Sequence, residues 1–502
     1  MADAGAIRRI VVVGGGTAGW MAAAALSRFL AGSGRRIVLV ESAAIGTVGV
    51  GEGTIPPIHE FNHQIGLDED EFVRATHATY KLGVDFVGWT REGERYFHQF
   101  GQIGRPLSGI PFHQLWLKHR THRSVGPLAA YSMSATAAAQ HRFGHTAMKP
   151  DDPLSQIAYA FHFDASVYGQ FLRGFAERFG AERIEGRIVE VEQDSETGFV
   201  TALRLDDDRR VRGDLFIDCS GFRSLLLGQT LGVPFEDWTH WLPCDRAVTV
   251  ASARTDPLLP YTRSTAHAAG WQWRIPLQHR TGNGHVYSSA HMSDEDAQKI
   301  LLDTLDSEAI AEPRLLHFKA GRRSRSWEAN VVAMGLSAGF LEPLESTSIH
   351  LIQHAVQKLL ALFPGPAISP VERDEFNRAM VASYEPVRDF IILHYLANQR
   401  PEPFWKQVRE MAVPDSLAHK IALFREHGRV FRTNEELFDV PSWVAVMLGQ
   451  AVVPSGYDPL VDAIPDADVL RAMAELRSEY EQAAQTLPLA SDYVERTLAA
   501  AQ

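Results

Sequence analysis

The sequence predicts an α/β fold, and three segments of the chain, two near its start and one far along it, carry this prediction. Residues 10–30 have the pattern of a buried strand, a glycine turn and a helix. Residues 36–41 have the pattern of a buried parallel strand that ends in a carboxylate, and residues 214–221 that of an apolar strand that ends in Ser-Gly. Strands of this kind belong to a mostly parallel sheet with helices on its faces. We therefore expect one sheet assembled from segments that are discontinuous in sequence.

The glycine turn after the first strand has the features of a dinucleotide-binding site. Residues 11–19 read VVVGGGTAG, and the helix expected at residues 18–30 would present its N-terminal backbone amides to a pyrophosphate. Glu41 ends the second strand about 20 residues later, where an acid binds the ribose hydroxyls of a dinucleotide. This fingerprint does not distinguish FAD from NAD. The candidate contacts with the dinucleotide are Gly14, Gly16, Thr17, Ala18, Gly19 and Glu41.

Two further glycine-containing segments are candidates for contact with the cofactor. Residues 48–56 form a glycine-dense loop that includes Gly49 and Gly51, and its composition is too permissive for simple packing. Residues 331–340 form another strand that runs into a glycine turn, with Gly335 and Leu336 at the turn. These two segments and residues 271–276 are the three candidates for the position next to the reactive ring of the cofactor.

The rest of the chain predicts a substrate-side sheet followed by a mainly helical part. Ser346 or Thr347 is expected to cap a helix that runs to about residue 362. We divide the chain into residues 1–350, a discontinuous nucleotide-binding module with an inserted sheet, and residues 351–502, a helical region that covers the substrate. The other predicted elements are strands at 81–89, 96–101, 187–192 and 200–205 and helices at 168–179 and 467–487.

Composition restricts the class of function. With 502 residues and 45% hydrophobic residues, the chain can bury a large core. Its formal net charge of −12 argues against nonspecific binding to nucleic acid or to an anionic membrane, because such binding depends on Lys and Arg. Cys219 and Cys244 are too few for a disulfide framework and lack metal-ligand spacing, so we expect a cytoplasmic protein without a metal site. The apolar stretch at residues 10–30 is interrupted by glycines, and a strand, turn and helix explain it better than a membrane anchor.

Two motifs give this dinucleotide-binding chain a family resemblance. Residues 271–276 read WQWRIP, and residues 335–347 read GLSAGFLEPLEST. Together with the glycine fingerprint they resemble the flavin-dependent halogenases, the tryptophan and indole halogenase family. Flavin hydroxylases commonly have Asp at the position of Leu336, so this residue departs from hydroxylases and matches the halogenase form. The resemblance extends from Gly14 to about Tyr395, which is most of the chain.

The resemblance implies the fold, the cofactors and the reaction. The nucleotide-binding module would be an FAD-binding Rossmann-like domain of the flavin monooxygenase type. Reduced FAD, supplied by a separate flavin reductase, would react with O₂ and with chloride or bromide to give hypohalous acid. This small oxidant would pass through an internal tunnel to the substrate. The expected partners are therefore a flavin reductase and a small aromatic molecule, and the oligomeric state stays open, a homodimer included.

Lys81 and Glu345 are the candidate catalytic residues by resemblance. Lys81 resembles the family's lysine that receives hypohalous acid, either through a hydrogen bond from its ammonium or by forming a haloamine with its neutral amine. Glu345 resembles the glutamate that steadies the active halogen or the cationic ring intermediate, or that deprotonates this intermediate. The residue types alone also allow simpler roles, because an isolated lysine is usually a surface group and a carboxylate before a helix is favoured electrostatically.

The start of the helix after Glu345 is the candidate halide site. A turn that enters a helix exposes backbone N–H groups that bind an anion, although an ordinary N-cap would have the same sequence. By resemblance, the backbone amides of Thr347 and Ser348 would hold chloride or bromide beside the flavin. Many relatives have Gly in place of Ser348.

The aromatic candidates fall into two groups. Trp271 and Trp273 share one face of a strand and could simply fill the core, but the resemblance implies that their segment separates the flavin from the organic substrate. By resemblance, halogenases of free tryptophan recognise the amino-acid backbone through a Tyr-Tyr pair and a nearby Glu in the C-terminal half, and residues 431–457 contain no equivalent pair. We therefore expect indole, an indole derivative or a larger aromatic substrate. The candidates for the partition are Trp271, Trp273, Ile275 and Pro276, and those for the ring site, where packing is the alternative, are His98, Phe100 and Trp443.

Two other functions remain open on the sequence. A flavin-dependent aromatic monooxygenase would hydroxylate its substrate and take hydride directly from NADPH. A non-catalytic flavin-binding protein would bind FAD without turnover, and Lys81 and Glu345 in matching contexts argue against it.

Overall fold

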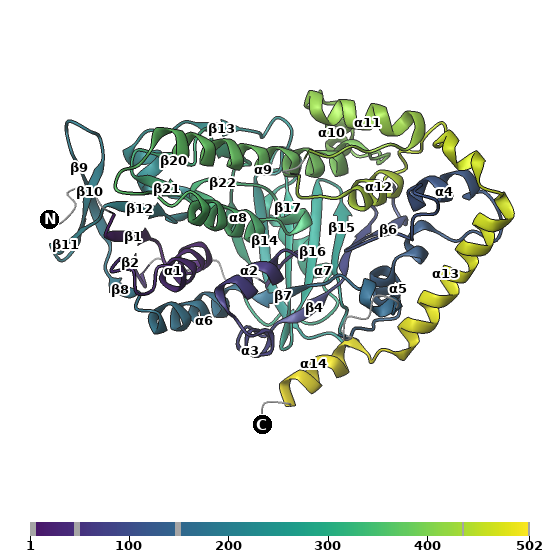
Figure 1. Ribbon diagram of the computed structural model, residues 1–502, viewed down its shortest axis with the longest axis horizontal. Helices are drawn as coiled ribbons and strands as arrows, with labels where there is room; N and C mark the ends of the chain where they lie inside the picture. Colours follow the sequence, from purple (N-terminus) through teal and green to yellow (C-terminus); the bar gives the residue numbers. More distant parts are fainter. Residues whose placement is uncertain (1–6, 45–50, 146–151, 434–435, 500–502) are drawn as a thin grey trace.

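The computed structural model describes residues 7–44, 51–145, 152–433 and 436–499. The predicted α/β fold is present, and its nucleotide sheet gathers strands from distant parts of the chain (Figure 1). Neighbouring strands of this sheet run parallel except at the edge strand β20. The expectation of a sheet that is discontinuous in sequence is confirmed. The order across the sheet is β20 (Trp327–Glu328), β21 (Val331–Ala333), β12 (Leu215–Asp218), β1 (Arg9–Val13), β2 (Arg36–Glu41) and β8 (Glu182–Glu185).

The apolar side chains of the nucleotide sheet alternate between two cores. On β1, Ile10 and Val12 belong to the large core, whereas Val11 and Val13 belong to a smaller one. This alternation is what a strand that is covered on both faces requires. The first face is covered by α1 (Thr17–Phe29), which packs against α6 (Ala165–Arg178) and α8 (Ser348–Ala361), and the second by β9 (Ile188–Gln193), β10 (Val200–Leu205) and β11 (Arg210–Arg212).

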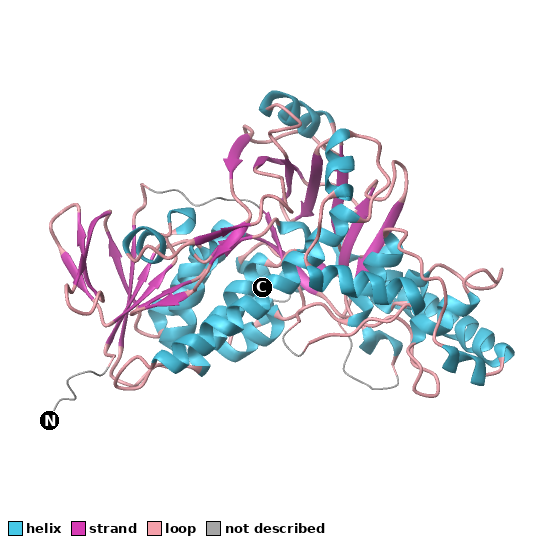
Figure 2. Ribbon diagram, turned by 90° about the horizontal axis from the view of Figure 1, so that it is seen from above, coloured by secondary structure: helices cyan, strands magenta, loops and turns pink. Residues whose placement is uncertain are grey.

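A second sheet, which we call the substrate sheet, crosses the middle of the molecule. Figure 2 shows its strands as a group apart from those near the N-terminus. Its strand β16 (Gly270–Pro276) carries both tryptophans of the WQWRIP motif and pairs antiparallel with β15 and β17. The order is β18 (Arg314–His317), β14 (Arg246–Ala253), β17 (Arg280–Tyr287), β16, β15 (Thr262–His267), β5 (Gly83–Val87) and β6 (Arg95–Gln99).

Lys81 lies in a third, smaller sheet. The single strand expected at residues 81–89 is wrong, because the chain changes sheets at Leu82, whose N–H donates to the Pro260 carbonyl. Strand β4 (Thr79–Lys81) pairs with β7 (Ala160–Asp164), which also pairs with β3 (Gly51–Gly53). Lys81 therefore stands at the end of a strand, in the same small sheet as the glycine loop.

Helices form most of the chain after the nucleotide sheet. The long helix α9 (Pro370–Leu396) packs on α8, while α10 (Pro403–Glu410) and α11 (Asp415–His427) pack on α9. Helix α12 (Val440–Gly449) packs on β6, and α13 (Asp466–Thr486) runs along the outer edge of the molecule toward α14 (Ala490–Ala499) (Figure 1). The boundary predicted after residue 350 falls inside α8, and the division into two domains stays a prediction.

The other predicted elements are confirmed with small shifts of their ends: helices at 168–179 and 467–487 and strands at 96–101, 187–192 and 200–205. None of the described helices combines the length and the apolar character that a membrane span requires. The remaining elements are α2 (Ile58–Ile65), α3 (Glu69–Ala75), α4 (Phe112–His119), α5 (Met133–Ala139), α7 (Asp294–Asp303), and a small sheet of β13 (Phe235–Asp237), β19 (Gly321–Arg323) and β22 (Gly339–Phe340).

Candidate active site

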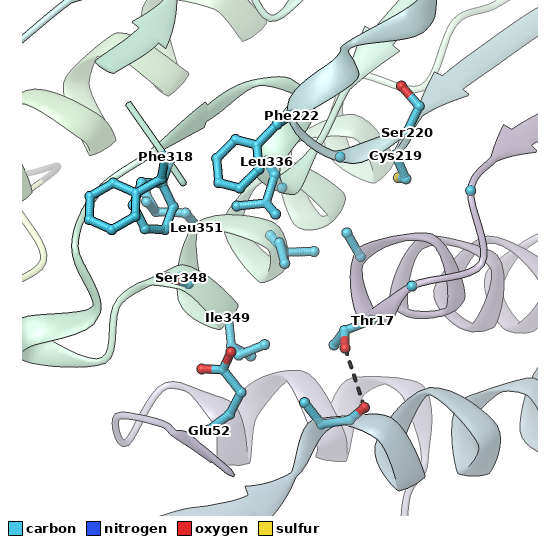
Figure 3. Close-up of a pocket in the computed structure, with 18 of the residues that line it drawn as sticks. Thr17, Glu52, Cys219, Ser220, Phe222, Phe318, Leu336, Ser348, Ile349 and Leu351 are labelled. Atoms are coloured by element: carbon cyan, nitrogen blue, oxygen red, sulfur yellow. Dashed lines mark hydrogen bonds between the residues drawn. The ribbon is translucent and has the colours of Figure 1, made fainter. Parts of the chain in front are cut away.

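A cavity of about 540 Å³, which we call the cofactor cavity, is lined by residues of both the nucleotide sheet and the substrate sheet. Figure 3 shows Thr17, Glu52 and Leu336 around it. Of the predicted cofactor contacts, Gly49 lies outside the described residues, and Gly19 lies behind the lining, packed against the Gly14 carbonyl. Those that line the cavity are Gly14, Gly16, Thr17, Ala18, Glu41, Gly51, Gly335 and Leu336.

The first turn of the nucleotide sheet has no room for a side chain at Gly14. The φ of Gly14 is +109°, and a Cβ there would lie 2.3 Å from the Cys219 carbonyl oxygen. Its N–H donates to the Val40 carbonyl at 2.8 Å, which ties the turn to β2. Gly16 differs, because nothing lies within 4 Å of the position of a Cβ. A tight turn followed by an open helix N-terminus suits the pyrophosphate of FAD.

Glu41 ends β2 and lines the same cavity. It forms an ion pair with Arg183 of β8, and its carboxylate occupies the space of a side chain at Gly15, where a Cβ would lie 1.4 Å from Oε2. The carboxylate therefore lies beside the glycine turn, where the fingerprint predicts the ribose of the dinucleotide. The residues present fit FAD at both its pyrophosphate and its ribose.

Lys81 is fully buried, and two oxygen atoms accept hydrogen bonds from its amino group. Nζ donates to Ser346 Oγ at 2.8 Å and to the Thr54 carbonyl oxygen at 3.1 Å, and it lies 5.2 Å from the centre of the Phe100 ring. Burial lowers the pKa of Lys81 to about 7, against the attraction of nearby carboxylates. Both the ammonium and the neutral amine are therefore accessible near neutral pH.

Glu345 is buried at the end of the short 3₁₀ helix Pro343–Glu345, and two histidines contact its carboxylate. His98 Nδ1 lies 3.0 Å from both carboxylate oxygens, and His394 Nε2 lies 2.8 Å from Oε1. Burial alone would raise the pKa of Glu345, but the charges and hydrogen bonds of His98 and His394 lower it to about 2. Glu345 is therefore ionised at neutral pH, as a group that stabilises positive charge must be.

The start of α8 has the polar groups of an anion site. The predicted N-cap position is correct at Thr347, but among the described residues its side chain makes no cap hydrogen bond and its buried Oγ1 has no partner. The first backbone N–H groups of a helix also lack partners within the helix. Ser346 precedes this position in a left-handed conformation with φ of +58°, and Ser348 lines the cofactor cavity. The helix start therefore reaches the cavity with polar groups that a halide could satisfy.

The four predicted partition residues have different surroundings. Trp273 and Ile275 line the cofactor cavity, and the buried Trp273 Nε1 has no hydrogen-bond partner among the described residues. Trp271 and Pro276 lie outside its lining. Trp271 Nε1 donates to Glu342 Oε2 at 3.0 Å, so this indole is anchored deeper in the protein. Trp273 and Ile275 are thus the partition candidates that face the cofactor.

The predicted catalytic and ring-site residues also lie outside the lining of the cofactor cavity. His98 contacts Glu345, the ring of Phe100 faces Lys81, and all of them are buried. Trp443 belongs to the same aromatic region, because its ring packs edge-on against that of Phe390, which neighbours His98. The structure therefore brings these residues to one buried site on the far side of Ser346, whose hydroxyl accepts from Lys81.

Sequence reasoning missed four residues of this site. Phe390 and His394 are separated by four positions on one face of α9, and Phe438 stacks on Phe390 with 3.8 Å between ring centres. A buried aromatic helix face gives no signal that separates a site from ordinary core. Ser346 had a signal, because it stands between the predicted glutamate and the predicted halide site.

Known proteins resemble this chain over its whole length. A family model described as Tryptophan halogenase matches residues 9–466. The tryptophan 6-halogenase SttH of Streptomyces toxytricini is 35% identical, with 97% of each chain covered. Among solved structures, Xcc4156, a flavin-dependent halogenase from Xanthomonas campestris, has a TM-score of 0.95 at 45% identity and covers 98% of each chain. BrvH, a flavin-dependent halogenase from Brevundimonas sp. BAL3, has a TM-score of 0.94 at 46% identity and covers 98% of this chain and 99% of its own.

The fold, the cofactor cavity and these similarities define a flavin-dependent enzyme. The chain belongs to the tryptophan halogenase family. It is an FAD-dependent halogenase of aromatic substrates, with a halide as the second substrate.

Proposed function

We propose that the protein is the halogenating member of a two-component system and that it acts on an electron-rich ring such as indole rather than on free tryptophan. A separate flavin reductase supplies the reduced FAD. When bound, reduced FAD with O₂ supplies the two-electron oxidation that converts chloride or bromide to hypohalous acid. Lys81 and Glu345 then direct this oxidant to the ring.

The observation that carries this proposal is that Ser346 and Gly53 stand between the cofactor cavity and Lys81. Ser346 lines the cofactor cavity, and its hydroxyl accepts a hydrogen bond from Lys81, which does not line the cavity. Ser348, at the candidate halide site, lies on the cavity side. This arrangement supports an oxidant that is made in the cavity and used on the Lys81 side.

The polar and aromatic contacts of Lys81 stabilise its ammonium form against the burial that lowers its pKa to about 7. Two carbonyl or hydroxyl oxygens accept from Nζ, and the aromatic face of Phe100 attracts a cation. The ammonium donates a hydrogen bond to hypohalous acid. As the halogen is transferred, the ammonium gives this proton to the oxygen of the acid, which leaves as water. The ring takes the halogen, Glu345 accepts the ring proton, and that proton returns to Lys81 to restore the site. The neutral amine, which would form a haloamine instead, is the alternative.

The region around Trp443 supports a substrate without an amino-acid backbone. Lys420 Nζ lies 4.6 Å from the centre of the Trp443 ring, but it is paired with Glu436 at 3.1 Å. These two charges neutralise each other and leave neither for an amino group or a carboxylate of a substrate. Between residues 431 and 457 the sequence has a single tyrosine, Tyr457. SttH, by contrast, is described as a tryptophan 6-halogenase.

Reconstitution tests the proposal. The protein is mixed with FAD, a flavin reductase, NADH, bromide and indole, and parallel reactions contain free tryptophan or lack one component. We expect bromoindole only in the complete mixture and a lower yield from tryptophan. Absence of any brominated indole compound with FAD demonstrably bound would refute the proposal. Oxidation of NADPH without the reductase, or an oxygenated product without halide, would support the hydroxylase alternative.

A further inference from the structure

Glu52 places a carboxyl group in the cofactor cavity. It is the middle residue of β3 and, with Gly53, belongs to the lining of the cavity. In Figure 3 its carboxyl group points toward Ile349, in the first turn of α8, where Ser348 also lines the cavity. Strand β3 lies against the segment that leads into this helix, because a Cβ at Gly53 would be 2.7 Å from Ser346 Oγ. Glu52 therefore faces the end of the cavity that contains the candidate halide site.

The carboxyl group of Glu52 is not committed to another side chain. Within the residues that the structure describes, it makes no hydrogen bond or ion pair, whereas Glu41, the other carboxylate of the lining, pairs with Arg183. Lys81 attracts Glu52 but donates its hydrogen bonds to other oxygen atoms. Burial raises the pKa of Glu52 to about 7, against this attraction. Both forms of the group are therefore populated near neutral pH, and a nearby charge can decide between them.

A halide ion in the same cavity favours the protonated form of Glu52. A carboxylate and a halide are both anions, and they repel each other strongly where little water separates them. Binding of the halide therefore raises the affinity of Glu52 for a proton, and by linkage the proton raises the affinity of the cavity for the halide.

The other ionisable groups around Glu52 do not replace it in this role. Those on the elements next to β3 are paired or kept neutral by burial. The pairs are Asp164 with Arg280 and Arg274 with Asp306, and the neutral groups are His162 and His350. The basic residues of the cavity lining are Arg187 and Arg223, which follow strands β8 and β12 of the nucleotide sheet, and His317 at the end of β18.

We propose that Glu52 takes up a proton when the halide binds in the cofactor cavity and supplies this proton to the hypohalous acid formed there. Halide, O₂ and the neutral reduced flavin FADH₂ give hypohalous acid, water and oxidised FAD. The halide and the flavin each give two electrons to O₂, and the two oxygen atoms receive the two hydrogens of the flavin and one further proton. Glu52 holds this further proton. The inference rests on the proposed formation of hypohalous acid in the cavity.

Proton uptake on bromide binding tests the proposal without turnover. The full-length protein with oxidised FAD bound is titrated with sodium bromide at constant ionic strength, in weak buffer slightly above pH 7, and a pH indicator reports the protons that are bound. We expect uptake of up to about one proton per bromide from Glu52, in addition to any share of Lys81, whose pKa is also about 7. In Glu52→Gln the uptake should fall to about half or less, whereas Lys81→Ala should keep the share of Glu52. Glu60→Gln, which removes an exposed carboxylate of α2 outside the cavity lining, is the matched control and should not change the uptake.

Three results would overturn the proposal: no proton uptake with bromide by the unaltered protein, equal uptake by Glu52→Gln, or complete loss of uptake in Lys81→Ala. A flavin fluorescence titration checks the FAD affinity of each variant. If Glu52 served only to contact the cofactor, Glu52→Gln would weaken FAD binding and, once saturated with FAD, would take up as many protons as the unaltered protein. Bromination of indole is measured separately. Its absence from a protein that takes up the proton would refute the proposed function and not the role of Glu52 in halide binding.

Discussion

At the scale of single residues, the site places a cation and an anion in the protein interior and gives each its own partners. Lys81 has Ser346 and the Thr54 carbonyl, and Glu345 has His98 and His394. Unpaired charges at such depth would be strongly destabilising, so these partners are a condition of folding as well as of chemistry. Because the two charged groups do not bond to each other, each can act on a different atom of the reacting pair.

The pKa of Lys81 gives a prediction at this scale. The ammonium form is lost as pH rises through the pKa of about 7, because burial stabilises the neutral amine. The rate of single-turnover bromination, measured with FAD reduced in advance, should therefore fall as pH rises above about 7. A rate that rises over the same range would show that the neutral amine reacts and that a haloamine forms.

The residues that sequence could identify are those in contiguous motifs. Lys81 and Glu345 stand in such motifs; both are buried, and Ser346, next to Glu345, accepts a hydrogen bond from Lys81. His394 gave no signal, because it contacts Glu345 only through the folding of α9 against β6 and the 3₁₀ helix. The bond from Trp271 to Glu342 was hidden for the same reason, since it joins two distant segments. Pairings of this kind depend on tertiary packing that a local pattern does not encode.

At the scale of elements, the small sheet of β3, β7 and β4 sets the position of Lys81. The sequence predicts one strand over residues 81–89. The part of it at residues 83–87 is confirmed as β5. The break at Leu82 was missed because buried residues continue across it from one sheet to the next. This break lets Lys81 face the glycine loop, where Gly53 lies against it.

Gly53→Ala should displace the Lys81 amino group. A Cβ at this position would lie 2.7 Å from Ser346 Oγ and 3.2 Å from Lys81 Nζ, so one of these groups must move. We expect bromination to fall about 10-fold or more while FAD binding is retained, because the displaced groups are outside the pyrophosphate site. Gly174→Ala on the exposed face of α6 is the matched control, since nothing lies within 4 Å of its Cβ. The control should keep full activity and gain up to about 1 kcal/mol in stability. Equal bromination by both variants would contradict the assigned position of Lys81.

At the scale of the whole molecule, the cofactor cavity exists because strands from distant segments meet in one sheet. The sequence predicts a sheet that is discontinuous along the chain but not its strand order, and the edge pairing of β8 with β2 could not be derived from local patterns. The strand, glycine turn and helix at the start of the chain were predicted from one contiguous pattern, whereas the contacts of Gly14 with Cys219 and Val40 and the place of Gly19 behind the lining depend on other strands. At Gly14 the fold leaves no room for a side chain. At Gly16 the fold leaves room, and only the cofactor would be displaced by a side chain.

Alanine substitutions at these glycines should have different effects on stability. Gly14→Ala should lower the free energy of unfolding by about 2 kcal/mol or more and weaken FAD binding, because its Cβ would meet the Cys219 carbonyl at a positive φ. Gly16→Ala should leave the stability of the FAD-free protein nearly unchanged but weaken FAD binding, because its side chain would enter the space of the cofactor. Urea unfolding and a flavin fluorescence titration measure the two quantities. Equal destabilisation by both substitutions would contradict this account of the turn.

The central claim is that the oxidant is made on one side of Ser346 and used on the other. Its most direct test is Lys81→Ala supplied with reduced FAD, O₂ and bromide, with an added scavenger that captures hypobromous acid that escapes into solution. The account predicts that bromide-dependent oxidant still forms and reaches the scavenger, while bromination of indole by the enzyme falls about 10²- to 10⁴-fold. An unchanged yield of bromoindole in the presence of the scavenger would contradict it.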